Sequence, residues 1–525
     1  MTTNARCAPG SRGGSWAALL IGATLLPFGQ FQTVVPLAAW LAPVFLLRFA
    51  RTQRARVALP VLALVQYLAT MVSLRGGLVP GDTPWLYALG GALGVLSFAA
   101  DAALARRVPG WGRTLVLPAA AVVLDWAFGQ SALGTLGSAA YSQAGSLPLT
   151  QVVSATGIWG LLFLIVWLAP VANEVWERGP DRLALRLAVV PFAAALLLTQ
   201  TFGGARLAFF APAAPTVRVA ALAADRALWH GISVPDAATL AAGDDGVRAA
   251  ARAQYAPIVD ELLARTRAQA QAGAKIVVWS EGAAFVLKED EQALIGRAQA
   301  LAREQGIYLQ LGLIVPLRAE RYPFAENRAI LIDPAGHVTQ DYHKTVHPLG
   351  DAAVFAPGPG VVPTTDTPYG RLATVICFDA DFPALVRQAG RARADILLVP
   401  ANDWRPVHTI HARAAIFRAV ENGVAIVRPA GNGIAVAADH LGQALASADY
   451  FATPALTMVA DVPTHGAATL YGRIGDTFAY LCVAALLAAG AAALGGRRAA
   501  GTTIGTARVP AAVGGSRAGG VGDAL

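Results

Sequence analysis

The sequence predicts a two-part protein, in which a bundle of membrane-spanning helices carries an α/β domain. Three observations support this fold class. Hydrophobic residues make up 55% of the chain and charged residues only 14%, whereas roughly 25% of residues are charged in an average globular protein. Apolar windows of membrane-spanning length recur within residues 1–210. Within residues 211–476 charges return, and Gly and Pro interrupt apolar runs of strand length.

Eight apolar windows are predicted to cross the membrane. A bilayer core about 30 Å thick requires a helix of about 20 residues. The predicted spans are residues 15–29, 32–47, 57–74, 85–105, 114–130, 155–173, 185–204 and 477–496. The first span is short and contains Pro27, so the first two could instead form one broken hairpin. The Gly/Ala-rich residues 497–525 cannot bury a core and are predicted to be a disordered cytoplasmic tail.

The basic residues predict the orientation of these spans. When the N-terminus is placed inside, every cluster of arginines falls on the same side of the membrane. The clusters are Arg6 and Arg12, Arg48 to Arg56, Arg106 to Arg113, Arg178 to Arg186, and Arg497 with Arg498. By the positive-inside rule, residues 211–476 are expected outside and both termini in the cytoplasm. A cleaved signal peptide over residues 1–29 is the alternative, but the spans that follow favour an uncleaved anchor.

Composition argues against several classes of site. The net charge of +8 does not indicate nucleic acid, because the arginines lie in short clusters between apolar stretches and not on one basic face. The three cysteines, Cys7, Cys377 and Cys482, are too few and too scattered for a disulfide framework or a zinc site. No GxGxxG or Walker-type loop is present. We therefore expect no metal, no cofactor and no nucleic-acid partner.

Strand-like and helix-like segments alternate in residues 211–476. The predicted strands are residues 217–224, 275–280, 308–315, 329–333, 372–377, 396–400 and 424–428. The predicted helices include residues 249–272, 291–305 and 408–422. This alternation favours an α/β domain built from layers of sheets and helices over a run of hairpins.

Three polar residues stand at or near the ends of apolar strands. Glu281 ends the run KIVVWSEG, where a carboxylate is costly unless it is paired or used. Lys344 lies in QDYHKTVHPLGD, and Cys377 ends RLATVIC just before a predicted helix. Taken singly, Glu281 could be a surface acid, Lys344 an ordinary loop lysine and Cys377 a buried hydrophobe. Their order and setting together carry more weight than any one of them.

The three residue types suit one chemistry. A thiol with a reference pKa of about 8.5 is mostly protonated at neutral pH, so a carboxylate can act as its base and a lysine can favour thiolate and oxyanion. Attack on a carbonyl then gives a thioester. Cys7 is predicted inside and Cys482 within the last span, which leaves Cys377 as the lone external cysteine. A lone thiol in an oxidising compartment suits a nucleophile better than a structural role.

The order of Glu281, Lys344 and Cys377 resembles that of the catalytic residues in the nitrilase or carbon-nitrogen hydrolase superfamily. With eight spans, the pattern is similar to the apolipoprotein N-acyltransferases, which carry such a domain on the outer face of the bacterial inner membrane. Other segments that resemble this family are Tyr141-Ser142-Gln143, Pro148-Leu149, Gln151, Gly157, Trp159-Gly160, Phe163-Leu164, Asn173, Arg428 and Asn432 to Val436.

The resemblance implies a nitrilase-like αββα sandwich over residues 211–476 and a reaction in two half-steps. Cys377 would take an acyl chain from a phospholipid, and the α-amine of a diacylglyceryl-cysteine on an apolipoprotein would then accept it. Glu281 would be the general base, and Lys344 would stabilise the tetrahedral intermediate. The expected partners are a phospholipid donor, a lipoprotein acceptor and the bilayer. Candidate substrate-binding residues are Trp229, Phe378 and Trp404.

Three segments depart from the family's pattern. Where the family has a glutamate in a GEF segment after the lysine, this chain has the shorter Asp351. Where it has Cys-Tyr-Glu, this chain has Cys377-Phe378-Asp379, and the NDAWFGDS-like loop is reduced to Asn402-Asp403-Trp404-Arg405. The secondary acids Asp351 and Asp379 and the substrate loop are thus altered, which affects the identity of the substrate more than the class of reaction.

Two other functions fit parts of the pattern. A membrane-anchored amidase or nitrilase-type hydrolase would use the same triad but give the thioester to water, although many spans beside the site suit lipid entry better. A transporter with an external binding domain would carry ionisable residues in several spans. The clear cases here are Asp125 and Asp101, which is too few to favour transport. Asp125 could equally be an acid used in helix packing.

Overall fold

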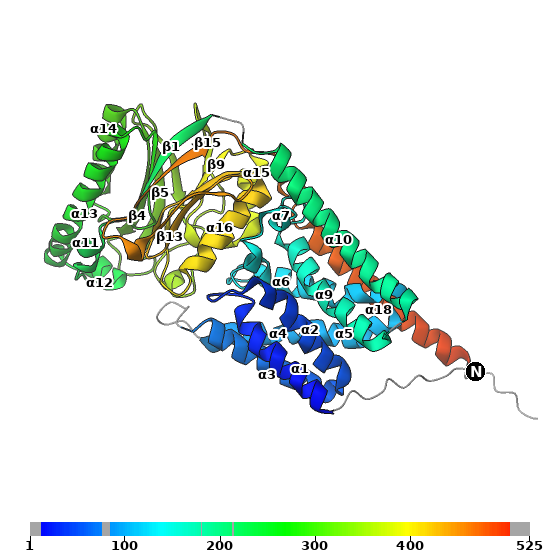
Figure 1. Ribbon diagram of the computed structural model, residues 1–525. Helices are drawn as coiled ribbons and strands as arrows, with labels where there is room; N and C mark the ends of the chain where they lie inside the picture. Colours follow the sequence, from blue (N-terminus) through cyan, green and yellow to red (C-terminus); the bar gives the residue numbers. More distant parts are fainter. Residues whose placement is uncertain (1–11, 76–83, 180, 213–214, 504–525) are drawn as a thin grey trace, which may run out of the picture.

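The computed structural model describes residues 12–75, 84–179, 181–212 and 215–503. It consists of an α/β domain and a bundle of apolar helices that packs against one side of this domain (Figure 1). The chain first forms most of the bundle, then the whole α/β domain, and returns along the bundle as the last helix, α18 (Thr477–Thr503). The predicted fold class is confirmed.

The bundle contains six described segments that are long and apolar enough to cross a membrane. They are residues Ala55–Ser73, Ala88–Arg107, Gly110–Gly129, Ile158–Arg178, Arg186–Phe209 and Thr477–Leu494. The bundle helices before the α/β domain are α1 (Arg12–Leu25), α2 (Pro36–Thr52), α3 (Ala55–Ser73), α4 (Pro84–Leu93), α5 (Val95–Leu104), α6 (Val116–Gly129), α7 (Leu147–Thr150), α8 (Val153–Thr156), α9 (Ile158–Arg178) and α10 (Arg182–Phe209).

Three parts of the bundle differ from the predicted spans. The first two correspond to α1 and α2, a packed pair of 14 and 17 residues, which is shorter than the roughly 20 residues that a bilayer core requires. The span over residues 85–105 is divided at Gly94 into α4 and α5. The last helix continues to Thr503, so residues 497–503, expected to be disordered, are helical. Residues 504–525 lie outside the described residues, as does Cys7.

Basic clusters from three separate connections meet at one end of the bundle. Arg51 lies 3.0 Å from Asp101 and 3.6 Å from Glu174. Glu174 also pairs with Arg113 and, at 2.8 Å, with Arg178. The arginines that follow the second, fourth and sixth predicted spans are therefore neighbours. Asp101, one of the two acids that a transporter would use, is held here in an ion pair.

The α/β domain contains two packed sheets. One has the strand order β15-β1-β2-β4-β5-β6, with β3 paired to β4, and the other has the order β14-β13-β11-β9-β8-β7; β10 pairs with β12. The strands are β1 (Thr216–Leu222), β2 (Ile276–Trp279), β3 (Ala284–Phe285), β4 (Tyr308–Pro316), β5 (Ala325–Ile332), β6 (Val338–His343), β7 (Thr364–Thr367), β8 (Gly370–Thr374), β9 (Ile396–Leu398), β10 (Ala401–Asn402), β11 (Ala425–Arg428), β12 (Ala430–Gly431), β13 (Ile434–Ala438), β14 (Ala444–Asp449) and β15 (Thr457–Pro463).

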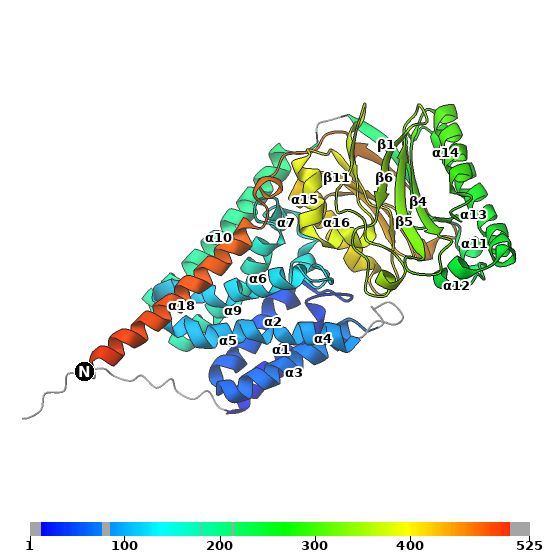
Figure 2. The same ribbon diagram turned by 180° about the vertical axis from the view of Figure 1, so that it is seen from behind.

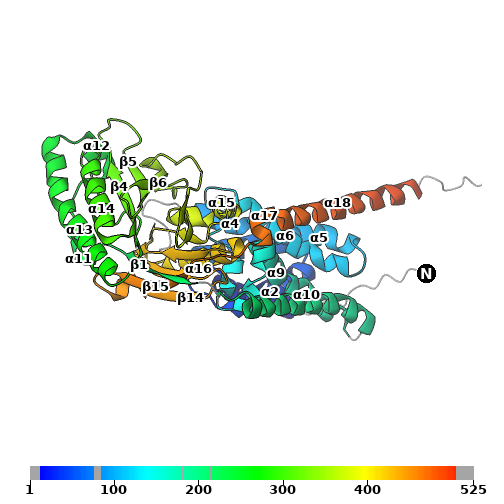
Figure 3. The same cartoon turned by 90° about the horizontal axis from the view of Figure 1, so that it is seen from above.

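Helices cover both outer faces of the sheets and complete an αββα sandwich. The helices of this domain are α11 (Arg226–His230), α12 (Ala237–Ala242), α13 (Asp245–Gln271), α14 (Glu291–Gln305), α15 (Pro383–Arg391), α16 (His408–Asn422) and α17 (Leu470–Ile474). Seen from behind, α15 and α16 lie on the bundle side, whereas α13 and α14 cover the far side (Figure 2). The view from above shows the same order of layers (Figure 3).

The central strands of each sheet are parallel, and this explains their uninterrupted apolar runs. β1, β2 and β4 pair in parallel, as do β8, β9 and β11. Parallel strands covered on both faces bury every side chain, and all residues of β2, β4, β9 and β11 are buried. The polar residues that follow these strands therefore emerge at the ends of a rigid, buried scaffold.

The bundle and the α/β domain share a hydrophobic core. Ala414, Phe417 and Val420 of α16 are buried in one cluster with residues of α2, α6 and α9. The ring of Phe417 meets the ring of Tyr141 edge-on at 5.2 Å between centroids. The helix that carries one wall of the candidate site is thus packed directly onto the membrane helices.

Candidate active site

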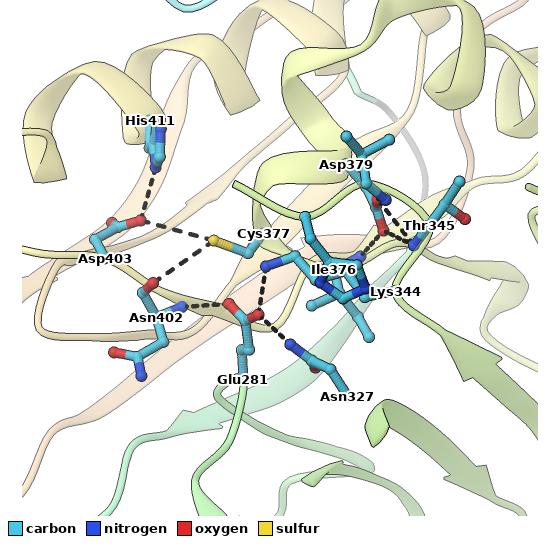
Figure 4. Close-up of polar contacts among 12 residues, drawn as sticks. Glu281, Asn327, Lys344, Thr345, Ile376, Cys377, Asp379, Asn402, Asp403 and His411 are labelled. Atoms are coloured by element: carbon cyan, nitrogen blue, oxygen red, sulfur yellow. Dashed lines mark hydrogen bonds and ion pairs between the residues drawn. The ribbon is translucent and has the colours of Figure 1, made fainter. Parts of the chain in front are cut away.

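Glu281 and Lys344 form a buried ion pair. Glu281 follows β2 and Lys344 follows β6, and their side chains are 6% and 2% exposed. The Lys344 Nζ donates to Glu281 Oε1 at 2.6 Å. Asn327 donates to the same oxygen at 2.7 Å, and the backbone N–H of Asn402 donates to Oε2 at 3.0 Å (Figure 4). Both carboxylate oxygens are therefore held in place, which compensates the cost of burying this charge.

The environment keeps the lysine protonated. Burial alone would lower the pKa of Lys344, but the negative charge of Glu281, followed by that of Cys377, raises this pKa well above its ordinary value. The charge of Asp351 acts in the same direction. Asp351 is half-buried at the start of a 3-10 turn over Asp351–Ala353. Lys344 is thus a fixed cation beside the thiol.

Cys377 begins the 3-10 turn η6 over Cys377–Asp381, which is named the nucleophile turn for the candidate role of Cys377. Its φ is +47°, a left-handed conformation that costs a non-glycine residue about 1–3 kcal/mol and is often found at active sites. Its N–H donates to Pro400 O at 2.9 Å. Burial raises the pKa of the Cys377 thiol well above its ordinary value, and the charge of Glu281 adds to this effect while Lys344 opposes it. The resting thiol is therefore protonated and requires a base.

Asp379 connects the loop of Lys344 to the turn of Cys377. This fully buried carboxylate accepts the hydroxyl of Tyr342 at 2.8 Å and the N–H groups of Val346 and Ile376 at 2.7 and 3.0 Å. Burial raises the pKa of Asp379 to about 6, against the opposing effect of its backbone donors. Among the described hydrogen bonds, Asp379 makes none to the Cys377 thiol. Its hydrogen bonds instead hold the Lys344 loop and the Cys377 turn together.

A second buried charge cluster lies on the other side of the thiol. Asp403 Oδ1 lies 4.0 Å from the Cys377 Sγ, accepts from Arg428 at 2.6 Å and lies 2.9 Å from His411 Nδ1. His411 Nε2 lies 3.6 Å from Asp381 Oδ2. Burial alone would lower the pKa of His411, but the charges of Asp381 and Asp403 raise it.

The geometry of this cluster bears on metal binding. Cys377, Asp403 and His411 lie close enough together to hold a metal ion. However, the Arg428 guanidinium already occupies the Asp403 oxygen and would repel a cation there.

The residues of this cluster were not predicted as site residues from the sequence. Asp403 and Arg428 were named only as parts of segments that resemble the family, and His411 was not named. His411 is one of two histidines in α16, and nothing in the local sequence separates it from an ordinary buried residue.

Comparison with known proteins shows which families this chain resembles. The family model described as carbon-nitrogen hydrolase matches residues 238–470. The apolipoprotein N-acyltransferase of Geobacter metallireducens is 29% identical over 457 residues, which cover 80% of this chain and 82% of the relative. That of Bradyrhizobium diazoefficiens is 27% identical and covers 71% of this chain and 72% of the relative. The chain is thus similar to the apolipoprotein N-acyltransferases over most of its length, and its α/β domain matches the carbon-nitrogen hydrolase model.

Among solved structures, an amidase from Nesterenkonia sp. is similar to part of this chain. It is 20% identical, covers 50% of this chain and 95% of the amidase, and superposes with a TM-score of 0.37. The carbon-nitrogen hydrolase model begins after the bundle helices that precede the α/β domain.

The three candidate substrate-binding aromatics of this N-acyltransferase homologue lie in different settings. Trp229 of α11 packs against Phe285 with 5.1 Å between ring centroids and lines a small pocket with Glu281 and Asn402. Phe378 is buried and contacts Phe382 and His411. Trp404 meets His411 edge-on and packs against a cluster that contains Leu136, Val407 and Ile410. Only Trp229 is brought beside Glu281.

The bundle contains a mostly apolar cavity. Its volume is about 550 Å³, and its walls come from the segment between α1 and α2, from α2, α3, α4, α5, α6 and α9, and from the loop after α6. Polar side chains on these walls are Gln30, Gln66, Thr70, Ser97, Asp125 and Ser131. Leu136 of the same loop also packs against Val407 and Ile410. The cavity wall is therefore continuous with the packing around the Trp404 loop.

Proposed function

We propose that this protein transfers an acyl chain from a phospholipid to the α-amine of a diacylglyceryl-cysteine on apolipoproteins, through a thioester on Cys377. The observation that carries the proposal is the buried Glu281–Lys344 pair beside a protonated thiol. This site stands in a domain that shares its core with membrane helices. The family relationship supports the same activity.

In the first half-reaction, Glu281 acts as general base. It takes the proton of the Cys377 thiol while sulfur attacks an ester carbonyl of the phospholipid. Lys344 stabilises the negative oxygen of the tetrahedral intermediate, since it is held as a cation. When the intermediate collapses, the carbon–oxygen bond of the ester breaks. The lysophospholipid oxygen recovers the proton from Glu281, and the acyl chain remains on sulfur as a thioester.

In the second half-reaction, the free amine of the acceptor attacks the thioester carbonyl. Glu281 takes a proton from the attacking nitrogen, and the carbon–sulfur bond breaks to form an amide. The departing thiolate of Cys377 recovers a proton from Glu281, which restores the resting site. Because burial and Glu281 both raise the pKa of this thiol, the resting state favours the protonated sulfur.

The bundle supplies a place for acyl chains. A cavity of about 550 Å³ falls within the roughly 300–1,000 Å³ of typical small-molecule sites, which are also mostly apolar. A hydrolase of small soluble amides has no need of such a cavity or of membrane helices. Trp229 lines the small pocket beside Glu281 and is proposed to contact the substrate.

We also propose where the protein is located in the cell and how it is oriented. The family and the six candidate spans indicate a bacterial inner-membrane protein. The common end of the arginine clusters supports an orientation with that end in the cytoplasm. The domain formed by residues 211–476 then lies on the periplasmic face.

The test is a two-step assay on the purified protein in phospholipid-containing micelles. Intact-protein mass spectrometry should show an acyl adduct that hydroxylamine removes, and Cys377→Ala should abolish it while remaining folded. The isolated acyl-enzyme should be stable in buffer and decay rapidly when a lipopeptide with a free N-terminal diacylglyceryl-cysteine is added. Rapid decay in buffer alone, with no acceleration by this lipopeptide, would overturn the proposal in favour of a hydrolase.

A further inference from the structure

A residue of the membrane bundle holds the end of the nucleophile turn. The carbonyl oxygen of Asp381, the last residue of η6, accepts two hydrogen bonds from Thr135 in the loop after α6. The Thr135 N–H donates at 3.0 Å and its Oγ1 donates at 2.7 Å. Thr135 is 3% exposed and Asp381 is 1% exposed. Residues separated by 246 positions in the chain thus meet at the end of the turn that begins with Cys377.

The Thr135 hydroxyl is the centre of a directional chain of hydrogen bonds. Because it donates to a carbonyl, its bond of 2.7 Å with Tyr141 must be one that the phenol donates. The phenol oxygen in turn accepts from Arg418 Nη2 at 3.0 Å. Arg418 is fully buried and pairs with Glu421 at 3.1 Å. Each hydroxyl therefore donates one hydrogen bond and accepts one, so the hydrogen bonds of this series all run in one direction, toward the carbonyl of Asp381.

The preceding residue is shaped for this close approach. Gly134 has a φ of +58°, and a Cβ placed on it would lie 2.9 Å from Asp381 O and 3.2 Å from the ring of Phe382. A side chain there would both strain the backbone and push against the nucleophile turn. The loop can lie against the turn only because glycine stands at this position.

The turn needs such support because its first residue is strained. Cys377 has a φ of +47°, and a strained residue persists only where the surrounding structure fixes it. Asp379 fixes the entry of the turn through the N–H of Ile376. Thr135 fixes its exit through the carbonyl of Asp381. We propose that Thr135 is a positioning residue for the Cys377 thiol, an inference that rests on the proposed role of Cys377 as nucleophile.

The experiment compares Thr135→Val with Thr135→Ser and the matched control Thr150→Val. Thr150 is also a buried threonine of the bundle, but among the described residues its hydroxyl bonds to Leu147 O of its own helix and not to the α/β domain. Two rates are measured, acyl-enzyme formation at saturating phospholipid and alkylation of Cys377 by iodoacetamide, the latter read from the Cys377 peptide. The half-saturating phospholipid concentration is measured alongside.

Thr135→Val should lower the rate of acyl-enzyme formation at saturation about tenfold or more, because small displacements of a reacting group are costly. The rate at which iodoacetamide alkylates Cys377 should also change in this variant. The half-saturating concentration of phospholipid should stay near that of the wild type. Thr135→Ser should restore both rates, and Thr150→Val should match the wild type. Gly134→Ala, which pushes on the same carbonyl, should reproduce the loss.

Three results would overturn the inference alone. The first is wild-type rates in Thr135→Val, and the second is an equal loss in Thr150→Val. The third is unfolding of both Thr135→Val and Gly134→Ala with Thr150→Val folded, which would assign Thr135 to stability. If the wild type forms no adduct at Cys377, the proposed function fails and the inference fails with it.

Discussion

The phenol of Tyr342 donates a hydrogen bond of 2.8 Å to the carboxylate of Asp379. Tyr342 lies on β6, just before Lys344, and Asp379 lies in the turn that begins at Cys377. The same carboxylate accepts the N–H groups of Val346 and Ile376. One buried acid therefore sets the separation of the lysine and the thiol, although it touches neither in the described hydrogen bonds.

Asp379 should give the enzyme an acid limb in its pH profile. Its pKa is raised by burial to about 6, so it takes up a proton as the pH falls below that value and loses strength as an acceptor. We expect acyl-enzyme formation to fall on the acid side of about pH 6. Asp379→Asn should lower the rate at neutral pH and remove this limb. Rates of acyl-enzyme formation between about pH 5 and 8 provide the measurement.

Stability should change in the opposite direction over the same range. Because the folded-state pKa of Asp379 lies above its ordinary value of 3.8, the native state binds this proton more tightly than the unfolded state does. The stability that Asp379 contributes is thus fully present below about pH 3.8 and is lost as the pH rises through about 6. Asp379→Asn should flatten this part of the dependence in thermal unfolding. An acid limb of activity unchanged in Asp379→Asn would show that another group causes it.

Glu281→Gln and Lys344→Met should each suppress thioester formation by about two orders of magnitude or more, since they remove the base and the oxyanion partner. They should differ in stability. Lys344→Met leaves a buried carboxylate with only Asn327 and Asn402 as partners, and breaking a buried pair in this way costs about 3–5 kcal/mol. Glu281→Gln retains an oxygen that can accept from Lys344.

The double variant Glu281→Gln/Lys344→Met provides the control for this comparison. It removes both charges, so its unfolding temperature should lie above that of Lys344→Met, while it forms no thioester. Thermal unfolding in detergent and mass spectrometry of the adduct are the two measurements. Substantial thioester in either single variant would mean that these residues do not have the proposed roles.

The charge cluster beyond the thiol should be sensitive to loss of its arginine. Arg428→Met leaves the fully buried Asp403 without its guanidinium partner, and we expect a loss of about 3–5 kcal/mol in the free energy of unfolding. Arg252→Met is the matched control, because Arg252 pairs with Asp290 at the surface with its side chain 46% exposed and should lose little. Equal unfolding temperatures for the two variants would contradict the importance of this cluster.

The sequence predicted elements that have strong periodicity. The predicted helices over residues 291–305 and 408–422 have the same bounds as α14 and α16, because their apolar positions repeat at helical spacing and glycine follows each C-terminus. Strands β7 and β14 were missed, since sequences such as TTDT and ALASAD lie half exposed at sheet edges. Such strands owe their existence to pairing partners and not to their own apolar content.

The candidate site likewise has a part that could be predicted from the sequence and a part that could not. Glu281 and Cys377 were recognisable because each follows an apolar run, whereas Lys344 follows the polar, partly exposed strand β6 and was recognised from the order of the three residues. The structure brings Glu281 and Lys344 into contact at 2.6 Å. The contact between Thr135 and Asp381 joins positions 246 apart. No local pattern marks it, because it depends on how the bundle packs against the α/β domain.

The last prediction concerns the orientation of the bundle. Reporters fused after residue 210, at the end of α10, and after Arg498, in α18, should read on opposite faces of the membrane, the first outside and the second inside. The physical reason is that Arg51, Arg113 and Arg178 gather at one end of the bundle, and arginine-rich ends remain in the cytoplasm. A fusion in the connection near residue 110 is the control and should read inside. An internal reading after residue 210 would place Cys377 in a reducing compartment and remove the argument that its isolation in the external domain marks a nucleophile.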